Sequence, residues 1–548
     1  MDYHYNLADL FEIVADAVPE REAVVQGERR VTFAQLDERA TRLAHHLQAA
    51  GVRQGDRVGL YLYNCPEYLE GALAAWKIRA VPININYRYV EDELRYLFDD
   101  AGLSALIFHE EFAPRVASVA PAVPSLRAFV SVRDAVGGDA GVRAPGTVAG
   151  AVEYESAVAG GSAERDFGER SGDDLYIIYT GGTTGMPKGV MWRHEDVFFA
   201  GLQGGNPGAP DITTPDELGT NAIARTNAPA TMPVAPLMHG NGHWSSLIGM
   251  HGGGKVVLAT SHRLDAHEVW SLVGRERVNI LSIVGDAMAR PLADALHAGG
   301  AGYDLSPLLV LTSAGALFSD DVKEKLRAKL GSTLIIDAFG MSEAGHQGMN
   351  LGRNGDGKLR FSIDAFTAVL DEDLRRIEPG SAKVGMLGRC GRLPLGYWKD
   401  ADKTDRTFVR DADGTRWVVA GDMATVEPDG SVIVLGRGSF CINSGGEKIY
   451  PEEVEMALKS HPSVFDALVV GVPDERWGER VAAVVQPREG RSITLAEVDA
   501  HCRAKVSGYK VPRELRIVGE IQRSPSGKAD YRWARAVAAG GTEVGSER

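Results

Sequence analysis

Cysteine, long apolar runs and basic charge are all scarce in this sequence. The four cysteines, Cys65, Cys390, Cys441 and Cys502, form no CxxC pair and have no metal-ligand spacing, which excludes a disulfide framework and a cysteine-based metal site. No stretch reaches the ~18 apolar residues that a membrane-spanning helix requires. The first residues, MDYHYNLADLFEIV, carry acids where a signal peptide has a basic start. These absences predict a cytoplasmic protein with reduced thiols and no transmembrane segment.

The charge of the chain is acidic. It has 59 Lys and Arg against 74 Asp and Glu, a net charge of -15 that leaves no surplus to neutralise nucleic-acid phosphates. We therefore expect no nucleic-acid partner, although a local basic patch can still hold a small phosphorylated ligand. The length of 548 residues exceeds what one core usually serves and predicts at least two domains.

Short apolar runs alternate with helical patterns, which predicts an α/β fold with parallel strands. A capping box at Thr32–Gln35 predicts a helix start, and 58–63 and 67–78 are expected to form a buried strand and the helix behind it. Residues 110–170 are interpreted as peripheral connections. The breaker-rich segment 203–231 is expected to be a long loop or insertion, and loops of that length are often functional.

The pattern changes near residue 416. RWVVAGDMATVEPDGSVIVLGRG predicts short antiparallel strands joined by a turn at 428–430. Residues 437–548 have the length of a small α/β unit, whose last dozen residues are expected to fray. We therefore predict one domain over 1–436 and a second over 437–548.

A glycine-rich loop follows an apolar strand at 175–189, LYIIYTGGTTGMPKG. Glycines let backbone N–H groups approach phosphate oxygens, and the threonine hydroxyls and Lys188 add donors and charge. A Walker A loop is excluded because Pro187 precedes the lysine and Gly189 follows it. The remaining alternative, a surface turn, rarely combines these residues directly after a buried strand.

The loop YTGGTTGMPKG resembles the phosphate loop of the acyl-adenylate-forming superfamily, which includes acyl-CoA synthetases, nonribosomal adenylation domains and luciferases. Further segments resemble the superfamily's motifs in its order along nearly the whole chain: 313–316 (SAGA), 337–343 (DAFGMSE), 420–422 (AGD), 436–437 (GR), 444–455 (SGGEKIYPEEVE) and 525–528 (PSGK). The resemblance implies a large N-terminal domain of several subdomains with mixed and parallel sheets, and a small mobile α+β C-terminal domain.

The resemblance also assigns nucleotide binding to a set of residues. They are Thr180, Gly181, Gly182, Thr183, Thr184, Gly185 and Lys188 in the loop, then Ser313, Ala314, Gly315, Asp337, Phe339, Gly340, Ser342, Asp422 and Arg437. Phe339 is expected to stack on adenine, Asp422 to accept the ribose hydroxyls, and Glu343 with Thr184 to hold Mg²⁺, which prefers oxygen ligands. Taken alone, Phe339 could be a core aromatic, Asp422 a turn residue and Glu343 a helix cap.

Lys528, Glu343 and His239 are the catalytic candidates that the resemblance implies. Lys528 ends a Ser-Pro-Ser-Gly-Lys loop that can deliver a cation into a cleft, and His239 is expected to line the carboxylate pocket. Without the resemblance, a surface lysine and a core histidine would be the simpler interpretations. Ser444, Gly445, Gly446 and Lys448 resemble the segment that approaches coenzyme A. Where relatives have a charged hinge residue, this chain has Gly438-Ser439-Phe440-Cys441.

The resemblance implies an ATP-dependent ligase that joins a carboxylic acid to coenzyme A through an acyl-adenylate. No carrier-protein domain is appended, but loading of a carrier protein and nucleotide binding without ligase output stay open as alternatives. Residues 191–196, 203–231 and 438–448 resemble actinobacterial ligases of the steroid side-chain and lipid type. Small residues at 283–287, Gly285 above all, predict room for a bulky sterol acid first and a medium- or long-chain fatty acid second. The oligomeric state stays open, with a homodimer as one option.

Overall fold

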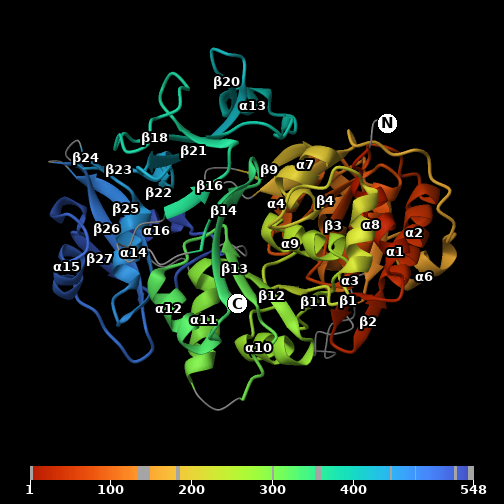
Figure 1. Cartoon of the computed structure of the whole chain (residues 1–548), viewed down its shortest axis with the longest axis horizontal. Coiled ribbons are helices and arrows are strands. Elements are labelled where there is room, and N and C mark those ends of the chain that lie inside the picture. Colours follow the sequence, from red (N-terminus) through yellow and green to blue (C-terminus); the bar gives the residue numbers. More distant parts are fainter. Residues whose placement is uncertain are drawn as a thin grey trace.

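The computed structural model describes residues 4–133, 148–180, 186–298, 302–351, 360–444, 447–474, 477–523 and 527–540. Figure 1 shows the N-terminal elements at one side of the molecule, the C-terminal elements at the other, and β12 to β14 between them. Within the described residues the strands form four sheets. No helix in those ranges is both long and apolar enough to cross a membrane.

The largest sheet runs through the middle of the molecule in the order β17, β18, β21, β22, β16, β15, β14, β13, β12, β10, β11, β1, β2, with β20 beside β21. Its strands from β14 back to β11 are parallel, and those from β15 onward pair antiparallel. The strands are β1 (Glu22–Gln26), β2 (Arg29–Thr32), β10 (Ala230–Pro233), β11 (Val256–Leu258), β12 (Val278–Ile283), β13 (Val310–Ala314), β14 (Leu334–Met341), β15 (Gly345–Asn350), β16 (Arg360–Ile363), β17 (Thr367–Leu370), β18 (Gly385–Arg389), β20 (Phe408–Arg410), β21 (Arg416–Val426) and β22 (Val432–Arg437).

A second sheet is entirely parallel, in the order β4, β3, β5, β6, β7. Its strands are β3 (Arg57–Tyr61), β4 (Val81–Asn84), β5 (Leu103–His109), β6 (Ala128–Val132) and β7 (Ala151–Glu153). The expected strand at 58–63 is confirmed as β3. The interpretation of 110–170 as peripheral connections is wrong in part, because β6 and β7 extend this sheet; their short lengths and small residues concealed them.

The helices cover these sheets and join them along the chain. They are α1 (Leu7–Ala17), α2 (Phe33–Ala49), α3 (Pro66–Lys77), α4 (Glu91–Ala101), α5 (Ala113–Val119), α6 (Tyr154–Gly160), α7 (His194–Ala200), α8 (Asp216–Ala224), α9 (Gly240–His251), α10 (Ala266–Arg275), α11 (Gly285–His297), α12 (Asp320–Leu330), α13 (Ala401–Thr407), α14 (Pro451–Lys459), α15 (Leu495–Arg503) and α16 (Tyr531–Ala538). The predicted capping box is confirmed: Thr32 Oγ1 accepts from the Gln35 N–H, and the Gln35 side chain accepts from the Thr32 N–H. The helix expected over 67–78 is confirmed as α3.

A third, small sheet places the predicted phosphate loop. It has the order β19 (Gly396–Tyr397), β9 (Lys188–Arg193) and β8 (Leu175–Thr180). One hydrophobic core joins α1 to α3 with this sheet and α9, and Trp76 and Trp192 are fully buried in it. The loop therefore starts from a strand that is packed against the main body.

The C-terminal elements form their own sheet, in the order β24, β23, β26, β25, with β27 beside β26. Its strands are β23 (Ile442–Ser444), β24 (Glu447–Ile449), β25 (Val464–Asp474), β26 (Gly478–Pro487) and β27 (Glu514–Ile517). The antiparallel hairpin predicted before it is confirmed as β21 and β22. A large part with mixed and parallel sheets and a small α+β part agree with the predicted fold class. The expected fraying concerns residues that lie largely outside the described ranges.

The 203–231 segment is not a loop throughout. It contains a 3₁₀ turn, η3 (Gln203–Gly205), helix α8 and the start of β10. Pro and Gly concealed α8, which lies against α1: a Cβ on Gly219 would be 3.2 Å from Ile13 Cγ2.

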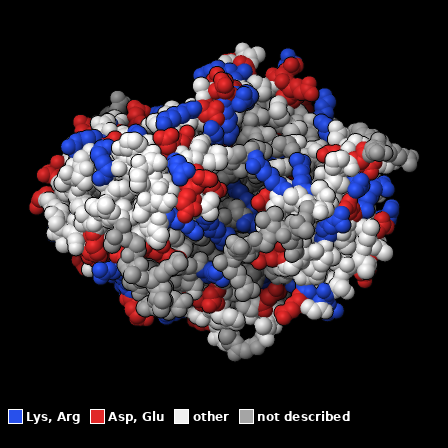
Figure 2. Space-filling view, turned by 180° about the vertical axis from the view of Figure 1, so that it is seen from behind, with Lys and Arg blue, Asp and Glu red and all other residues white. Residues whose placement is uncertain are grey.

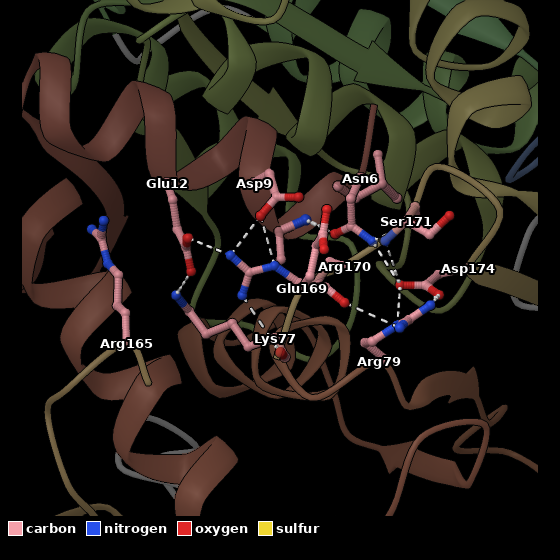
Figure 3. A network of polar contacts seen from close by, with 12 residues as sticks. Asn6, Asp9, Glu12, Lys77, Arg79, Arg165, Glu169, Arg170, Ser171 and Asp174 are labelled. Carbon is pink, nitrogen blue, oxygen red and sulfur yellow. Dashed lines mark hydrogen bonds and ion pairs between the residues drawn. The ribbon is translucent and has the colours of Figure 1, made fainter. Parts of the chain in front are cut away.

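Buried ion pairs fix the N-terminal helices to the segment that leads into β8 (Figure 3). Lys77, at the end of α3, is fully buried and pairs with Glu12 and, at 2.7 Å, with Asp37. Arg170 also pairs with Glu12, at 2.5 Å. Arg79 binds Asp174, the residue directly before β8, at 2.7 Å. The start of the strand that carries the phosphate loop is thereby held by charged contacts.

Replacing Lys77 with methionine should destabilise the fold, because each of its two buried carboxylate partners loses its fully buried cation and keeps an arginine as partner. Glu12 keeps Arg170, and Asp37 keeps Arg165. Breaking a buried pair in this way costs about 3–5 kcal/mol. Lys325 is the matched control: it pairs with Asp321 at 3.0 Å, but both side chains are about a third exposed, and Lys325→Met should cost under about 1 kcal/mol. Urea denaturation measures both. Equal losses would show that the Lys77 pairs contribute no more than a surface pair.

Candidate active site

A cavity of about 1160 Å³ lies beyond the carboxyl ends of β12, β13 and β14. Val284, Ala314 and Phe339 line it from these strands, and Lys528 lines it from the C-terminal part. Ligands of parallel sheets bind at this edge, because the strands diverge there and leave a crevice. Its walls therefore come from both parts of the chain.

One face of α9 forms a wall of the cavity. Gly240, Asn241, Trp244, Ser245 and Ile248 line it at spacings of three and four residues, which places them on one side of a helix. At 1.5 Å rise per residue this wall is about 12 Å long. The cavity has the length for an extended apolar group as well as for a nucleotide.

On the phosphate side, the structure describes the two ends of the predicted loop. Thr180 lines the cavity. Lys188, at the start of β9, pairs with Asp400 at 3.1 Å and is not among the residues that line the cavity. Gly181, Gly182, Thr183, Thr184 and Gly185 lie outside the described residues, so their predicted roles stay predictions.

Asn84 connects this loop with the histidine segment. Its side-chain amide donates to the Tyr179 carbonyl at 2.9 Å and to the Met238 carbonyl at 2.7 Å, and its oxygen accepts from the Tyr179 N–H at 2.7 Å. Tyr179 directly precedes Thr180, and Met238 directly precedes His239. Asn84 thus sets the spacing between two predicted substrate segments.

Most predicted nucleotide residues after β13 and β14 line the cavity. These are Ala314, Gly315, Phe339, Gly340 and Ser342. Two others support the wall from behind. The Ser313 hydroxyl accepts from the Gly285 N–H at 2.8 Å. Asp337 accepts from Lys323 at 2.8 Å, and burial raises its pKa to about 6.

Glu343 is held by a tyrosine. The Tyr397 hydroxyl donates to Glu343 Oε1 at 2.9 Å, and the Lys403 ammonium lies 4.0 Å from the centre of the Tyr397 ring. The bond to one carboxylate oxygen leaves the other oxygen of Glu343 available to a hard cation. Among the described residues no cluster of three or more His, Cys, Asp or Glu side chains could hold a metal by itself. The site fits Mg²⁺ bound through one carboxylate and the phosphates of a nucleotide.

Asp422, Arg437 and Lys528 face one another across the boundary between the two parts. Arg437 Nε lies 3.6 Å from Asp422 Oδ1, and these residues are paired between β21 and β22. Burial raises the pKa of Asp422, and Arg437 and Lys528 oppose that rise. Desolvation, followed by the charge of Arg437, lowers the pKa of Lys528, while Glu343 and Asp422 raise it. Lys528 is exposed and lines the cavity.

His239 occupies the N-cap of α9 and lines the cavity. Burial first, then the charges of Lys528 and Arg88, lower its pKa to about 3. The imidazole is therefore neutral at physiological pH, and its buried Nε2 has no hydrogen-bond partner among the described residues. A neutral ring suits a pocket for a carboxylate or its ester better than it suits proton donation.

The segment predicted to approach coenzyme A lies away from the cavity. Ser444 and Lys448 belong to the β23–β24 hairpin and do not line it, and Gly445 and Gly446 lie outside the described residues. Lys528 is inside the cavity in the same arrangement. The structure therefore presents the lysine, and not this hairpin, to the nucleotide cleft.

The expectation that Gly285 leaves room for a wide acid is wrong. Gly285 has φ +50°, and a Cβ there would lie 2.5 Å from the Leu317 carbonyl oxygen and 2.8 Å from Ala316 Cβ. The small side chain serves tight packing at the start of α11. Its neighbour Val284 is the residue that borders the cavity.

Glu452, in the first turn of α14, is buried against the end of β22. A Cβ on Gly436, which has φ +112°, would lie 2.2 Å from Glu452 Oε2, and that oxygen has no hydrogen-bond partner in the part of the chain that the structure describes. Burial, with the charge of Glu455 second, raises the pKa of Glu452 to about 8. The contact between the two parts thus holds a protonated carboxylic acid at neutral pH.

The site also contains three residues that the sequence did not predict, Asn84, Tyr397 and Glu452. Asn84 stands in a buried strand end, VPIN, where an amide side chain between apolar residues is a usable signal. Tyr397 lies more than 50 positions from Glu343, so no local pattern joins them. Glu452 stands in the first turn of a helix, where glutamate is common, and only its packing against Gly436 distinguishes it.

Lys and Arg side chains gather around a hollow near the middle of the face seen from behind (Figure 2). The chain as a whole is acidic, with a net charge of -15. The rim of this hollow also includes Asp and Glu side chains, and its cationic side chains can attract small anions such as nucleotides and phosphorylated thiols. This agrees with the expectation that a basic patch can hold a phosphorylated ligand.

A crevice at the ends of parallel strands, into which a separate C-terminal sheet brings a lysine, is the architecture of an adenylate-forming enzyme. Two family models match the chain, the AMP-binding enzyme over residues 11–386 and the AMP-binding enzyme C-terminal domain over residues 453–528. The chain belongs to the AMP-binding enzyme family.

Curated relatives match over almost the whole chain. A 3-oxocholest-4-en-26-oate--CoA ligase of Rhodococcus rhodochrous is 49% identical over 541 residues, 97% of this chain and 95% of the relative. A medium-chain acyl-CoA ligase, Mig, of Mycobacterium avium is 42% identical and covers 98% of this chain and 99% of its own. Among solved structures, the anthranilate CoA ligase AuaEII in complex with anthranoyl-AMP has a TM-score of 0.82 at 23% identity over 98% of both chains, a similarity of fold.

Asp422→Ala should weaken ATP binding about ten- to hundredfold, because each charge-assisted hydrogen bond to a ribose hydroxyl contributes roughly 1.5–3 kcal/mol. Isothermal titration calorimetry measures the change. The control is Asp429→Ala: Asp429 lies in the turn of the same hairpin and accepts hydrogen bonds from the Ser431 N–H and hydroxyl. A folded Asp422 variant with the ATP affinity of the control would remove Asp422 from the nucleotide site.

The pKa of Glu452 predicts a pH effect on the arrangement of the two parts. The carboxyl is protonated here up to about pH 8, whereas an exposed one ionises near 4.5. The free energy that favours this arrangement should therefore fall as the pH rises from about 4.5 to about 8, because separation lets the carboxyl ionise. Fluorescence energy transfer between labels on the two parts follows the population.

Glu452→Gln should remove that pH dependence, since the amide resembles the protonated acid and does not titrate. Glu453→Gln is the control, because Glu453 lies on the same turn but is half-exposed and pairs with Lys510 at 2.7 Å. An unchanged pH profile in Glu452→Gln would assign the effect to another group.

Proposed function

We propose that this enzyme is an acid–thiol ligase that converts a carboxylic acid, ATP and coenzyme A into acyl-CoA, AMP and pyrophosphate. The observation that carries the proposal is the placement of Lys528 in the cavity, with its charge coupled to Glu343 and Asp422. A nucleotide-binding protein without ligase output would not need this cation beside a cavity long enough for an acid. The 49% identical relative is a CoA ligase, which favours coenzyme A over a carrier protein as the acceptor.

In the first half-reaction the acid attacks the α-phosphorus of ATP and pyrophosphate leaves. The nucleophile comes from the substrate, so the protein supplies position and charge neutralisation. We assign adenine contact to Phe339, ribose contact to Asp422 and Arg437, and phosphate contact to Thr180 and Ser342. The Lys528 ammonium stabilises the negative charge that develops in the transition state.

We propose Glu343 as the carboxylate that holds Mg²⁺, with Thr184 contributing from the phosphate loop. The ion would neutralise phosphate charge during the displacement. Tyr397 fixes the orientation of Glu343 through its bond to Oε1. The neutral ring of His239 lies beside Asn241 in the wall where the acid's carboxylate would enter.

In the second half-reaction the thiol of coenzyme A attacks the acyl-adenylate, and AMP leaves. Ser444 and Lys448 are proposed to contact coenzyme A, together with Gly445 and Gly446. Because their hairpin lies away from the cavity here, we propose that residues 437–548 form a domain that rotates against 1–436 between the two steps. The close contact of Glu452 with Gly436 lies at the boundary between these domains.

A large apolar acid is our proposal for the substrate, with a steroid side-chain carboxylate first and a medium- or long-chain fatty acid second. The names of the relatives cover both classes. The α9 wall of about 12 Å matches a rigid ring system or a chain of about ten carbons. We also propose a cytoplasmic location, and a homodimer as the state to test by light scattering.

A screen of carboxylic acids with ATP and coenzyme A tests the function. We expect acid-dependent release of AMP and pyrophosphate with formation of one thioester per AMP. ATP binding without any acid-dependent pyrophosphate would favour the alternative, a nucleotide-binding protein. Thioester formation only on a carrier protein would change the acceptor.

Lys528→Ala should separate the half-reactions. Acid-dependent pyrophosphate release should fall at least about 10²-fold, the loss expected for one preorganised electrostatic group. Presynthesised acyl-AMP with coenzyme A should give thioester at close to the wild-type rate, because thiol attack does not need the cation at that place. Lys505→Ala, at an exposed lysine of the same domain, is the control. An equal fall of both half-reactions would contradict the assigned role.

A further inference from the structure

The first residue of the 203–231 segment has an unusual backbone. Gln203 has φ +56°, and it begins a run of three residues in the left-handed region with Gly204 (φ +55°) and Gly205 (φ +71°). Glycine adopts this region without strain, but a residue with a Cβ does not. Strained residues of this kind persist where the surroundings determine them, and they cluster at ligand sites.

The two glycines of this turn are fixed by packing. A Cβ on Gly204 would lie 2.2 Å from Asp211 Oδ1, and one on Gly205 would lie 2.6 Å from Leu218 Cδ2. The Gly204 carbonyl accepts from the Ile212 N–H at 3.1 Å. The segment therefore packs over the outer side of the turn and requires glycine at both positions.

Gln203, in contrast, lines the cavity. It is half-buried, and no hydrogen bond from its side chain to the described protein is present. Of the three left-handed residues in the turn, Gln203 is thus the one that carries a side chain, and it is also the one that lines the cavity. The amide is the feature that the turn presents there.

The cavity lining that α9 and β15 contribute beside Gln203 is apolar or neutral. The Asp211 carboxylate, in contrast, lies behind the turn, against Gly204, and is not part of the lining. Trp244 and Ile248 on α9 line the same cavity, and the Trp244 indole N–H donates to the Tyr176 hydroxyl at 2.9 Å, which fixes the ring. His346 on β15 also lines it, and burial lowers its pKa, so the imidazole is neutral.

These elements lie side by side. A Cβ on Gly345, before His346, would lie 2.4 Å from the carbonyl oxygen of Ala200, which ends α7 directly before the turn. η3 also contacts α9. The charged residues of the lining, among them Arg88, Glu93, Lys528 and Arg532, come from the segment after β4 and from the C-terminal part.

We propose that Gln203 is a specificity-determining residue that hydrogen-bonds an uncharged oxygen, a keto or hydroxyl group, carried by a large apolar acid at the end remote from its carboxylate. The proposal rests on the proposed ligase function. A position away from the carboxylate follows from α9. Its N-cap residue His239 lies close enough to Lys528 to feel its charge. A Cβ on Gly201, two residues before Gln203, would instead lie 3.5 Å from Trp244 Cδ2, further along the helix. A neutral oxygen follows from the neutral polar groups, Gln203 and His346. A substrate without that oxygen leaves a buried amide unpaired, and such sites discriminate strongly.

The test compares kcat/KM for 3-oxocholest-4-en-26-oate, its 3-hydroxy counterpart and the same acid without the 3-oxygen, with octanoate as an acid too short to reach Gln203. We expect the wild type to favour the oxygenated acids about tenfold, the value of one hydrogen bond. Gln203→Leu should abolish that preference and leave octanoate unchanged. Gln54→Leu, at an exposed glutamine remote from the cavity, should keep the preference.

The variant Gln203→Gly shows whether a lost preference comes from the missing side chain or from a change in stability. Glycine relieves the backbone strain, so the variant should unfold at the same temperature as the wild type or a higher one, and it should still lose the preference. A Gly or Leu variant that keeps the preference would overturn the proposal, as would a wild type that converts all three steroid acids equally. Failure of every acid, octanoate included, would overturn the proposed function itself.

Discussion

The approach of Lys528 to the cleft is the contact on which the active arrangement depends. Desolvation and the like charge of Arg437 oppose the charged form of the Lys528 ammonium group, while the Glu343 and Asp422 carboxylates favour it. The neighbouring packing holds it there: a Cβ on Gly527 would lie 3.1 Å from Val284 Cγ1, and Arg290 donates to the Lys459 carbonyl at 3.4 Å. Nucleotide phosphates would add negative charge beside this cation.

Residues that have no proposed role in the reaction position the phosphate loop, the histidine segment and Glu343 around this cleft. Asn84 holds the phosphate loop against the histidine segment, and Tyr397 holds Glu343. The ion pairs around Lys77 and Asp174 fix the strand from which the phosphate loop starts (Figure 3). Preorganisation of this kind lets fixed groups stabilise charge without rearranging during the reaction.

Local chemistry in the sequence predicted much of the fold. The Thr32 capping box, the strand that became β3, helix α3 and the β21–β22 hairpin each have a signal within a few residues. Motif order gave the family and the residues that line the cavity after β13 and β14. These features are predictable because the cause of each lies in neighbouring residues or in a motif.

Features that depend on tertiary packing were not predictable in this way. The small side chain of Gly285 suggested open space in the pocket, yet the place that a Cβ would take is already occupied by Ala316 and Leu317. Ser313 and Asp337 belong to motif segments, but their side chains bond to Gly285 and Lys323 behind the wall. The place of Gln203 in the cavity wall depends on which side of its turn faces the cavity, and the local sequence does not show this. Contacts between residues far apart in sequence decide each of these cases.

The central claim is that the acid itself attacks the α-phosphorus of ATP. An acid labelled with oxygen-18 in its carboxylate tests this directly, because attack transfers one carboxylate oxygen to the nucleotide. After a complete turnover with coenzyme A, mass spectrometry should find one labelled oxygen in AMP and none in pyrophosphate. Unlabelled AMP, or label in inorganic phosphate, would contradict the account.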